Sequence, residues 1–315
     1  MNLLYLGSDK RIDSMNLPAD IPAPLKQQAI RFLNGEYFDS VVYSSLAKIE
    51  KSKERKKVLE TLAETERQHA LFWKEVTHQE PEPVRIIRVR PLLWMRRLAG
   101  LVFTMKFLER HEHEVVGQYR QWLPLLDTTQ RDRLTAILKD EEEHESYFMS
   151  QVDEAIVRYI GFVALGLSDA VIEISGVHAG FLGAMGTTLI AGVAGLIVGF
   201  AASISMAVAA YLKAKSEKRP SPIASALITG VSYLLAVILL AVPYFLTGSM
   251  ITAFGVSIFL AILMSVGFTF YVSVVNETKF RREVIENTLL LIGTTIATYF
   301  FGNFIGTLFG IHAPV

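Results

Sequence analysis

Two long stretches of this chain are apolar and carry no charged side chain. No Asp, Glu, Lys or Arg occurs between Pro220 and Asn276, or from Asn287 to Val315. About 20 consecutive apolar residues are enough for a helix to span the ~30 Å hydrocarbon core of a bilayer. The sequence therefore predicts a membrane-embedded region and excludes a purely soluble protein.

The charged residues are concentrated in the first half of the chain. Residues 1–155 hold 48 of the 62 charged residues, and residues 156–315 hold the other 14. This split predicts a soluble domain over residues 25–154, after a proline-containing lead-in over residues 1–24, and a membrane domain over residues 155–315. The membrane domain divides into five spans, at about 156–180, 186–212, 222–246, 250–274 and 286–311.

Net charge and cysteine content exclude several classes of protein. The 31 basic residues equal the 31 acidic residues, whereas a nucleic-acid binder is usually strongly basic. Cysteine is absent, which rules out disulfides, thiolate nucleophiles, cysteine-ligated zinc and iron–sulfur clusters.

The soluble half has the pattern of an all-α domain. Amphipathic helices are expected at about 25–51, 53–77, 96–123 and 128–154, with a proline-containing connection between the second and the third. This arrangement predicts a four-helix bundle with a crossover. The connection carries arginines around Trp94, and it is either a solvated basic loop or a contact with anionic lipid headgroups. These arginines are Arg85, Arg88, Arg90, Arg96 and Arg97.

Two segments of the soluble half repeat one pattern of Glu, Tyr and His. A glutamate is followed seven residues later by a tyrosine, and a Glu-x-x-His motif comes 29 or 30 residues after that glutamate. An internal duplication accounts for this register. If these glutamates and histidines bind metal, the tyrosines are either side-chain partners of these ligands or ordinary core residues. The first copy comprises Glu36, Tyr43, Glu66 and His69, and the second comprises Glu112, Tyr119, Glu141 and His144.

The spacing of these residues predicts a dinuclear metal site. Residues three apart lie on one face of a helix, so each Glu-x-x-His motif can direct two ligands at one point. One Glu from each of two helices and a Glu-x-x-His from each of the other two form the di-iron or di-manganese constellation of ferritin-like bundles. The alternative is that these acidic helices have solvated faces. The predicted ligands are Glu36, Glu66, His69, Glu109, Glu112, Glu141 and His144.

Residues 25–154 resemble the rubrerythrin-like branch of the ferritin-like superfamily. The Glu109-x-x-Glu112 pair looks like the paired glutamates on the third helix of that branch. The resemblance implies a ferritin-like fold and a dinuclear iron site, with manganese as the other metal. This sequence lacks the Cys-ligated iron domain of rubrerythrins, which argues against a peroxidase with built-in electron delivery.

The first predicted span contains two carboxylates, and ionisable residues within a span mark ion pathways by default. Asp169 and Glu173 are four residues apart and share one helix face, and the only Lys or Arg within the five predicted spans is Arg158, eleven residues before Asp169. They are expected to hold a cation or protons. His178 is either an interfacial residue or part of this pathway, and Met206 is either a packing residue or a soft ligand.

The membrane half resembles the vacuolar iron transporter family. The segments GLSDAVIEISGVHAG (166–180) and GFAASISMAVAAYLKAKSE (199–217) look like the first two spans of that family. The resemblance implies that Asp169 and Met206 are pathway residues. This sequence has Ala210 where the family commonly has Glu, and only about ten residues replace the helical insertion of eukaryotic members.

The combination resembles prokaryotic membrane-bound ferritin-type proteins, which implies export of Fe²⁺ or Mn²⁺ from the cytoplasm. Of the four loops between the predicted spans, only those after the second and fourth spans carry basic residues, and basic loops face the cytoplasm. The bundle is therefore expected in the cytoplasm of a prokaryotic cell, with the C-terminus outside the inner membrane.

Proton antiport by a homodimer is the expected mechanism, and no residue is expected to be catalytic. The alternatives are a membrane-anchored di-iron ferroxidase or peroxide-reducing enzyme, and an iron sensor or storage module.

Overall fold

The computed structural model describes residues 23–110, 112–151, 155–184 and 187–310, apart from the side chains of residues 109, 112–114 and 142–157. Within these ranges the chain forms eleven α-helices, one short 3₁₀-helix and no strand, which confirms the all-α prediction. The chain divides into two compact units, residues 1–153 and 154–315. Each unit is described by itself.

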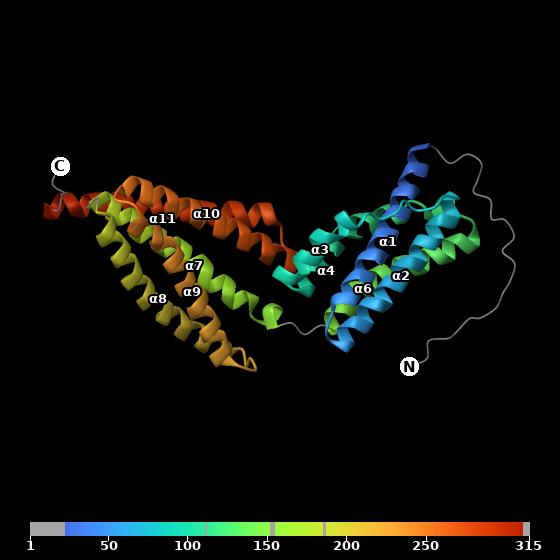
Figure 1. Ribbon diagram of the computed structural model, residues 1–315, viewed down its shortest axis with the longest axis horizontal. Helices are drawn as coiled ribbons and strands as arrows, with labels where there is room; N and C mark the ends of the chain where they lie inside the picture. Colours follow the sequence, from blue (N-terminus) through green and yellow to red (C-terminus); the bar gives the residue numbers. More distant parts are fainter. Residues whose placement is uncertain (1–22, 111, 152–154, 185–186, 311–315) are drawn as a thin grey trace. The chain divides into compact units, whose positions relative to one another are not determined.

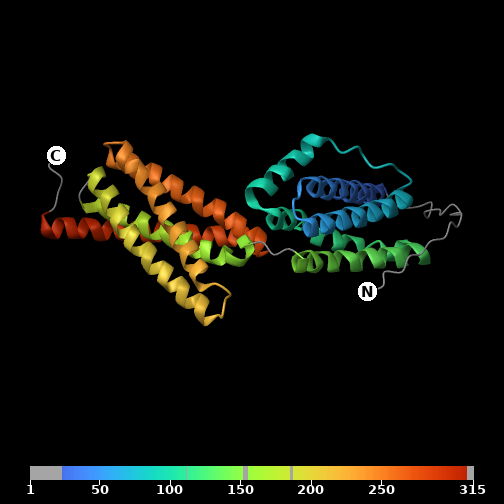
Figure 2. The ribbon, with the colours of Figure 1, turned by 60° about the horizontal axis from the view of Figure 1, so that its bottom comes forward.

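The first unit is built on four helices that share one hydrophobic core. These helices are α1 (Ala23–Ile49), α2 (Lys53–Thr77), α5 (Glu112–Tyr119) and α6 (Thr128–Gln151). α1 and α2 pack side by side along their length (Figures 1 and 2). Ser52 is the N-cap of α2, since its hydroxyl accepts a hydrogen bond from the backbone N–H of Arg55.

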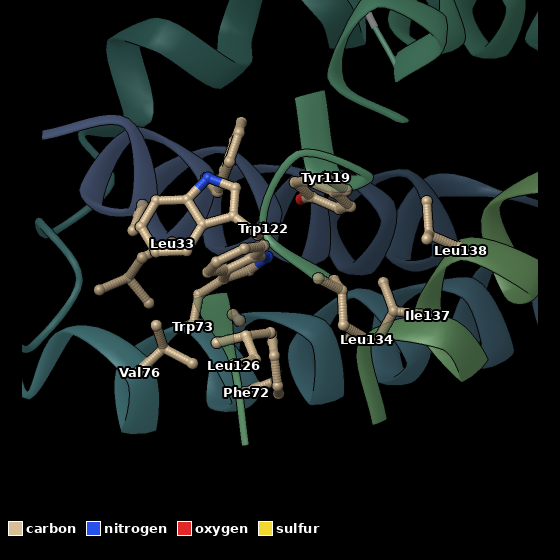
Figure 3. Packing of buried hydrophobic residues seen from close by; sticks show 13 residues of the cluster. Leu33, Phe72, Trp73, Val76, Tyr119, Trp122, Leu126, Leu134, Ile137 and Leu138 are labelled. Atoms are coloured by element: carbon tan, nitrogen blue, oxygen red, sulfur yellow. The ribbon is translucent and has the colours of Figure 1, made fainter. Parts of the chain in front are cut away.

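Aromatic side chains form the centre of this core (Figure 3). The ring of Trp73 lies 4.9 Å from that of Phe32, 5.0 Å from that of Tyr119 and 5.6 Å from that of Trp122, measured between ring centroids. Such tilted and edge-to-face contacts add to the hydrophobic stabilisation of a core. Because these rings come from α1, α2, α5 and the residues after α5, they fix the position of α5 against the α1–α2 pair.

The prediction of one continuous third helix at 96–123 is wrong. The structure has three shorter helices there, α3 (Ile86–Ala99), α4 (Leu101–Glu109) and α5. Gly100 separates α3 from α4 with a backbone φ of 95°, a value that glycine adopts readily and other residues rarely do. The proline-containing connection is also partly helical, and Pro91 lies inside α3, where its lack of an N–H removes one backbone hydrogen bond.

A buried carboxylate attaches α3 to the turn between α1 and α2. Glu50 follows α1, and its oxygens accept hydrogen bonds from Arg55 at 2.9 Å and from Arg96 of α3 at 2.7 Å. Burial alone would raise the pKa of Glu50, but the Ser52 amide and the two guanidinium groups outweigh it and lower the pKa to about 2. Glu50 therefore stays ionised and keeps both arginines bound at ordinary pH.

The second unit consists of five helices that are long and apolar enough to cross a membrane, as the sequence predicts. α7 contacts each of the other four helices, so it is the central helix of this unit (Figures 1 and 2). The five helices are α7 (Ala155–Ala184), α8 (Thr188–Ser216), α9 (Pro222–Leu246), α10 (Met250–Val275) and α11 (Phe280–Phe309).

Glycines allow α7 to approach its neighbours closely. A Cβ atom on Gly302 of α11 would lie 2.1 Å from the backbone oxygen of Gly180 of α7, and one on Gly183 would lie 2.4 Å from the backbone oxygen of Tyr299. Small residues commonly permit this kind of close packing between membrane helices. Hydrogen bonds add to it, because the Thr229 hydroxyl on α9 donates to the Phe162 carbonyl on α7 at 3.1 Å.

We predict that Gly302→Ala destabilises the membrane unit, because the added methyl group would overlap backbone that cannot move without separating α7 from α11. Overpacking of this kind costs about 1–3 kcal/mol. Gly293→Ala in the same helix is the matched control, since nothing lies within 4 Å of its added Cβ. The measurement is thermal unfolding of the full-length protein in detergent. Equal midpoints for the two variants would contradict the close α7–α11 contact.

Candidate metal centre

Four potential metal ligands from three helices meet inside the first unit. Glu36 lies on α1, Glu66 and His69 lie on α2, and Glu141 lies on α6. One ligand atom from each of the four residues lies within 4.8 Å of all the others. Three of the four residues are buried, and the side chain of Glu141 is 5% exposed.

The imidazole of His69 is at the centre of this cluster. Its Nδ1 lies 2.9 Å from Glu141 Oε1, 3.3 Å from Glu66 Oε2 and 3.8 Å from Glu36 Oε2. Its Nε2 points to the other side, 3.7 Å from Oδ2 of Asp140, which is half exposed. The three buried carboxylates therefore surround one nitrogen, while the second nitrogen faces the protein surface.

The aromatic core positions one of these carboxylates. The Tyr119 hydroxyl donates a hydrogen bond to Glu36 Oε1, and the Tyr119 ring packs edge-to-face on Phe32, four residues before Glu36 on α1. Residues four apart share one helix face, so the stripe of α1 that enters the core also directs Glu36 inward. On α2, the Glu-x-x-His spacing places Glu66 and His69 on one buried face in the same way.

The cluster combines three carboxyl groups with a single imidazole, and burial and mutual repulsion raise the pKa of two of the carboxyl groups. Burial raises the pKa of Glu66 to about 8, and the negative charge of Glu36 adds to the rise. Burial and the charge of Glu36 also raise the pKa of Glu141 to about 7. Burial opposes the charged form of Glu36 too, but the hydrogen bond and charge of His69 outweigh it and lower the pKa of Glu36. Three buried carboxylates beside one imidazole favour the uptake of protons or of a cation.

The donor set fits a divalent metal ion of the first transition series. Three carboxylates and one imidazole are hard or borderline ligands that suit Fe²⁺, Mn²⁺ or Zn²⁺. His69 would bind through Nδ1, which faces the carboxylates, while its Nε2–H is directed at Asp140. Metal-bound histidines usually donate their second N–H to a carboxylate or carbonyl, which fixes the ring and its tautomer, and Asp140 is the carboxylate on that side, at 3.7 Å.

The cluster contains four of the seven predicted ligands. The other three, Glu109, Glu112 and His144, have side chains outside the described residues, so the second metal position remains a prediction. The sequence interpretation did not include Asp140, next to Glu141, or Asp39, one helical turn after Glu36. Asp39 lines a cavity of about 810 Å³ together with Glu36 and Glu141. Its spacing of three residues from Glu36 on an amphipathic helix is the signal that would have identified it.

The acidic pair of the second unit lies on its central helix. Glu173 of α7 accepts a hydrogen bond of 2.5 Å from the hydroxyl of Tyr233 on α9. Met206 of α8 packs against the same core cluster as Tyr233 and the α7 residues that flank Asp169. Tyr233 is a polar partner that the sequence interpretation missed, because a tyrosine in an apolar run gives no signal of its own.

His178 is fully buried in the helix packing, which rules out a lipid-exposed interfacial position for it. Its ring lies 4.1 Å from that of Tyr244, measured between centroids. Gly195 of α8 provides the space, because a Cβ atom there would lie 2.3 Å from Nε2 of His178.

Comparison of the chain with protein-family models, with curated proteins and with solved structures gave no match. The chemical interpretation of these sites therefore depends on their own geometry.

We predict that metal binding to the cluster strengthens as pH rises. Glu66 and Glu141, with pKa values of about 8 and about 7, hold protons at lower pH that a metal ion must displace. Each displaced proton changes the dissociation constant by about tenfold per pH unit below the pKa. Titration of the full-length protein with Mn²⁺ at pH 6.5 and 7.5 measures this effect. Equal affinities at the two pH values would contradict it.

We also predict that Tyr119→Phe weakens metal binding by about tenfold, because Glu36 loses the hydrogen bond that orients it while the ring packing remains. Tyr37→Phe is the matched control, since Tyr37 lies at the edge of the same core and makes no hydrogen bond to the cluster among the described residues. Mn²⁺ titration gives the affinities, and thermal unfolding of the metal-free protein shows whether packing is intact. An unchanged affinity would show that Tyr119 does not orient the ligand.

Proposed function

We propose that this protein exports a divalent metal ion, Fe²⁺ or Mn²⁺, from the cytoplasm in exchange for protons. The observation that carries the proposal is the presence of two acidic sites in one chain. One is the buried cluster of the first unit, and the other is the pair Asp169 and Glu173 on the central helix of a unit with five candidate membrane spans.

The first unit would collect the metal ion. Three buried carboxyl groups around His69 favour a divalent cation once they lose their protons, and the raised pKa values of Glu66 and Glu141 make occupancy depend on pH. A site with these properties fills when cytoplasmic metal is abundant. The resemblance to rubrerythrin-like bundles supports a dinuclear site completed by Glu109, Glu112 and His144.

The second unit would carry the ion across the bilayer. Carboxylates inside a membrane domain are costly and typically mark ion pathways. Asp169 and Glu173 are one turn apart on α7, and Tyr233 hydrogen-bonds to Glu173. Two adjacent carboxylates can hold either a divalent ion or shared protons, which is the chemistry that metal–proton exchange requires. Met206 would add a soft ligand on the same path.

Orientation and assembly follow from the sequence. The basic loops between α8 and α9 and between α10 and α11 favour a cytoplasmic position for both loops and for the first unit. The C-terminus then lies outside the inner membrane. Five spans cannot form two equal inverted halves, so a homodimer with its path beside the two α7 helices is the expected assembly.

A second candidate function is a membrane-anchored di-iron ferroxidase or peroxide-reducing enzyme. The cavity of about 810 Å³ favours it, because this cavity is lined by Glu36, Tyr119 and Glu141 and gives a small molecule room beside the metal ligands. Against it, an enzyme held by a membrane anchor has no need of Asp169 and Glu173.

The test is anaerobic Fe²⁺ entry into proteoliposomes that contain a pH-sensitive dye, made with the full-length protein. We expect Fe²⁺ entry with opposed proton movement. We expect Asp169→Asn to reduce the initial rate by at least about tenfold, because the pathway loses a charged ligand. Glu283→Gln, at the start of α11, is the matched control and keeps the rate of the unaltered protein.

Two outcomes would contradict the proposal. A folded, metal-loaded protein that gives no flux would favour the anchored enzyme, especially if it consumes oxygen or peroxide with bound iron. Equal rates for Asp169→Asn and Glu283→Gln would remove Asp169 from the pathway. Glu66→Gln/His69→Gln tests the collecting role separately, and we expect it to slow transport at low Fe²⁺ concentrations more than at saturating concentrations.

A further inference from the structure

Helix α3 exposes an apolar stripe on the first unit. Ile87, Pro91, Trp94 and Leu98 are spaced by three or four residues, which places them on one helix face. Ile87 is 69% exposed, Trp94 61% and Leu98 79%. Large apolar side chains exposed together in this way mark a surface that is normally covered.

The opposite face of α3 attaches it to the bundle. Val89 and Leu92 are buried, and Arg96 is bound to Glu50 at 2.7 Å. α3 packs against α1 and α4 and lies on the outer side of α1 (Figure 2). The apolar stripe therefore points away from the core that α1, α2, α5 and α6 share.

Arginines border the apolar stripe. On a helix with 100° per residue, Arg88 falls on one side of the stripe, and Arg90 and Arg97 fall on the other. None of these three, nor Arg85, forms a salt bridge with an acidic side chain in the described parts of the chain. The sequence from Pro83 to Leu108 contains six basic residues and no acidic one. Arg85, Arg88, Arg90 and Arg97 therefore give this surface a positive charge that no described acidic side chain pairs with.

A basic groove adjoins the exposed end of the stripe. A cavity of about 690 Å³ is lined by Trp94 and Arg97 of α3 and by residues at the α1–α2 turn. Four cationic side chains line it, against the single carboxylate of Glu50. The guanidinium carbon of Arg97 lies 6.0 Å from the centre of the Trp94 ring. The four cationic side chains are Lys51, Arg55, Arg96 and Arg97.

We propose that α3 lies in the plane of the membrane interface, with its apolar stripe among the lipid chains and its arginines on anionic phospholipid headgroups. Apolar residues on one face, arginines beside them and a tryptophan between the two are typical of interfacial helices. Positive charge complements the anionic lipid of a cytoplasmic leaflet. The same chain also carries five helices that are long and apolar enough to cross a membrane, so the first unit would be tethered to a bilayer. This proposal does not depend on metal transport.

The chain provides its own probe of this contact. Its three tryptophans all lie in the first unit, and Trp73 and Trp122 are fully buried in the bundle core. Trp94 is therefore the only tryptophan that lipid or aqueous quenchers can reach. The experiment measures the fluorescence of the full-length protein in nanodiscs that contain anionic lipid brominated near the headgroup end of the acyl chains.

We expect brominated lipid to quench most of the emission that Trp94→Phe removes, and aqueous iodide to quench little of it. Substituting Gln at Arg88, Arg90 and Arg97 together, or using zwitterionic lipid, should lower the lipid quenching at least about twofold, because the electrostatic attraction is lost. The matched control places a single new tryptophan on the exposed face of α2, as Trp94→Phe/Glu60→Trp. Its added emission should be open to iodide and insensitive to brominated lipid.

Two results would overturn the proposal. Quenching of Trp94 by iodide and not by brominated lipid would place α3 in water. Protection of Trp94 from both quenchers would mean that a protein surface, such as a second copy of this chain, covers the stripe. Thermal unfolding of the arginine variant shows whether its first unit is still folded, and Glu50 and Arg96, which hold α3, are unchanged in it.

Discussion

Burial of three carboxylates around one imidazole is the constraint that the packing of the first unit must offset. Glu36, Glu66 and Glu141 come from three helices, and their charges repel one another in a site that water reaches poorly. His69 compensates for part of this charge, and protons or a metal ion must compensate for the rest. The aromatic core around Trp73 and Tyr119 keeps the three helices together against this repulsion. The packing of the core therefore offsets the destabilisation caused by the buried carboxylates. It also holds these side chains in place, so the site is preorganised for a cation.

Much of this arrangement can be predicted from the sequence, because spacing on a helix determines direction. The Glu66-x-x-His69 motif must present both side chains on one face of α2, and the uncharged runs can only be membrane helices or a buried core. The repeat of this motif in α6 predicts that Glu141 faces the same point. The cluster of Glu36, Glu66, His69 and Glu141 confirms that these four residues meet.

Other features depend on contacts between residues far apart in the chain, which spacing does not reveal. The break at Gly100 follows from a single residue with positive φ inside an otherwise helical pattern, and it separates α3 from α4 where one continuous helix was expected. The helical state of the arginine-rich segment depends on Val89 and Leu92 finding a partner surface and on Arg96 reaching Glu50. The bond between Tyr233 and Glu173 joins two helices whose pairing the sequence leaves open.

The central claim is that His69 and the three buried glutamates bind a divalent metal ion directly. Pulsed electron paramagnetic resonance of the full-length protein loaded with one equivalent of Mn²⁺ tests this claim most directly, because it detects nitrogen bound to the metal. We predict a modulation from a coordinated imidazole nitrogen that weakens or disappears in His69→Gln and persists in the matched control His78→Gln, which changes the residue that ends α2. A spectrum without nitrogen coupling in the unaltered protein, or one that His69→Gln leaves unchanged, would contradict the account.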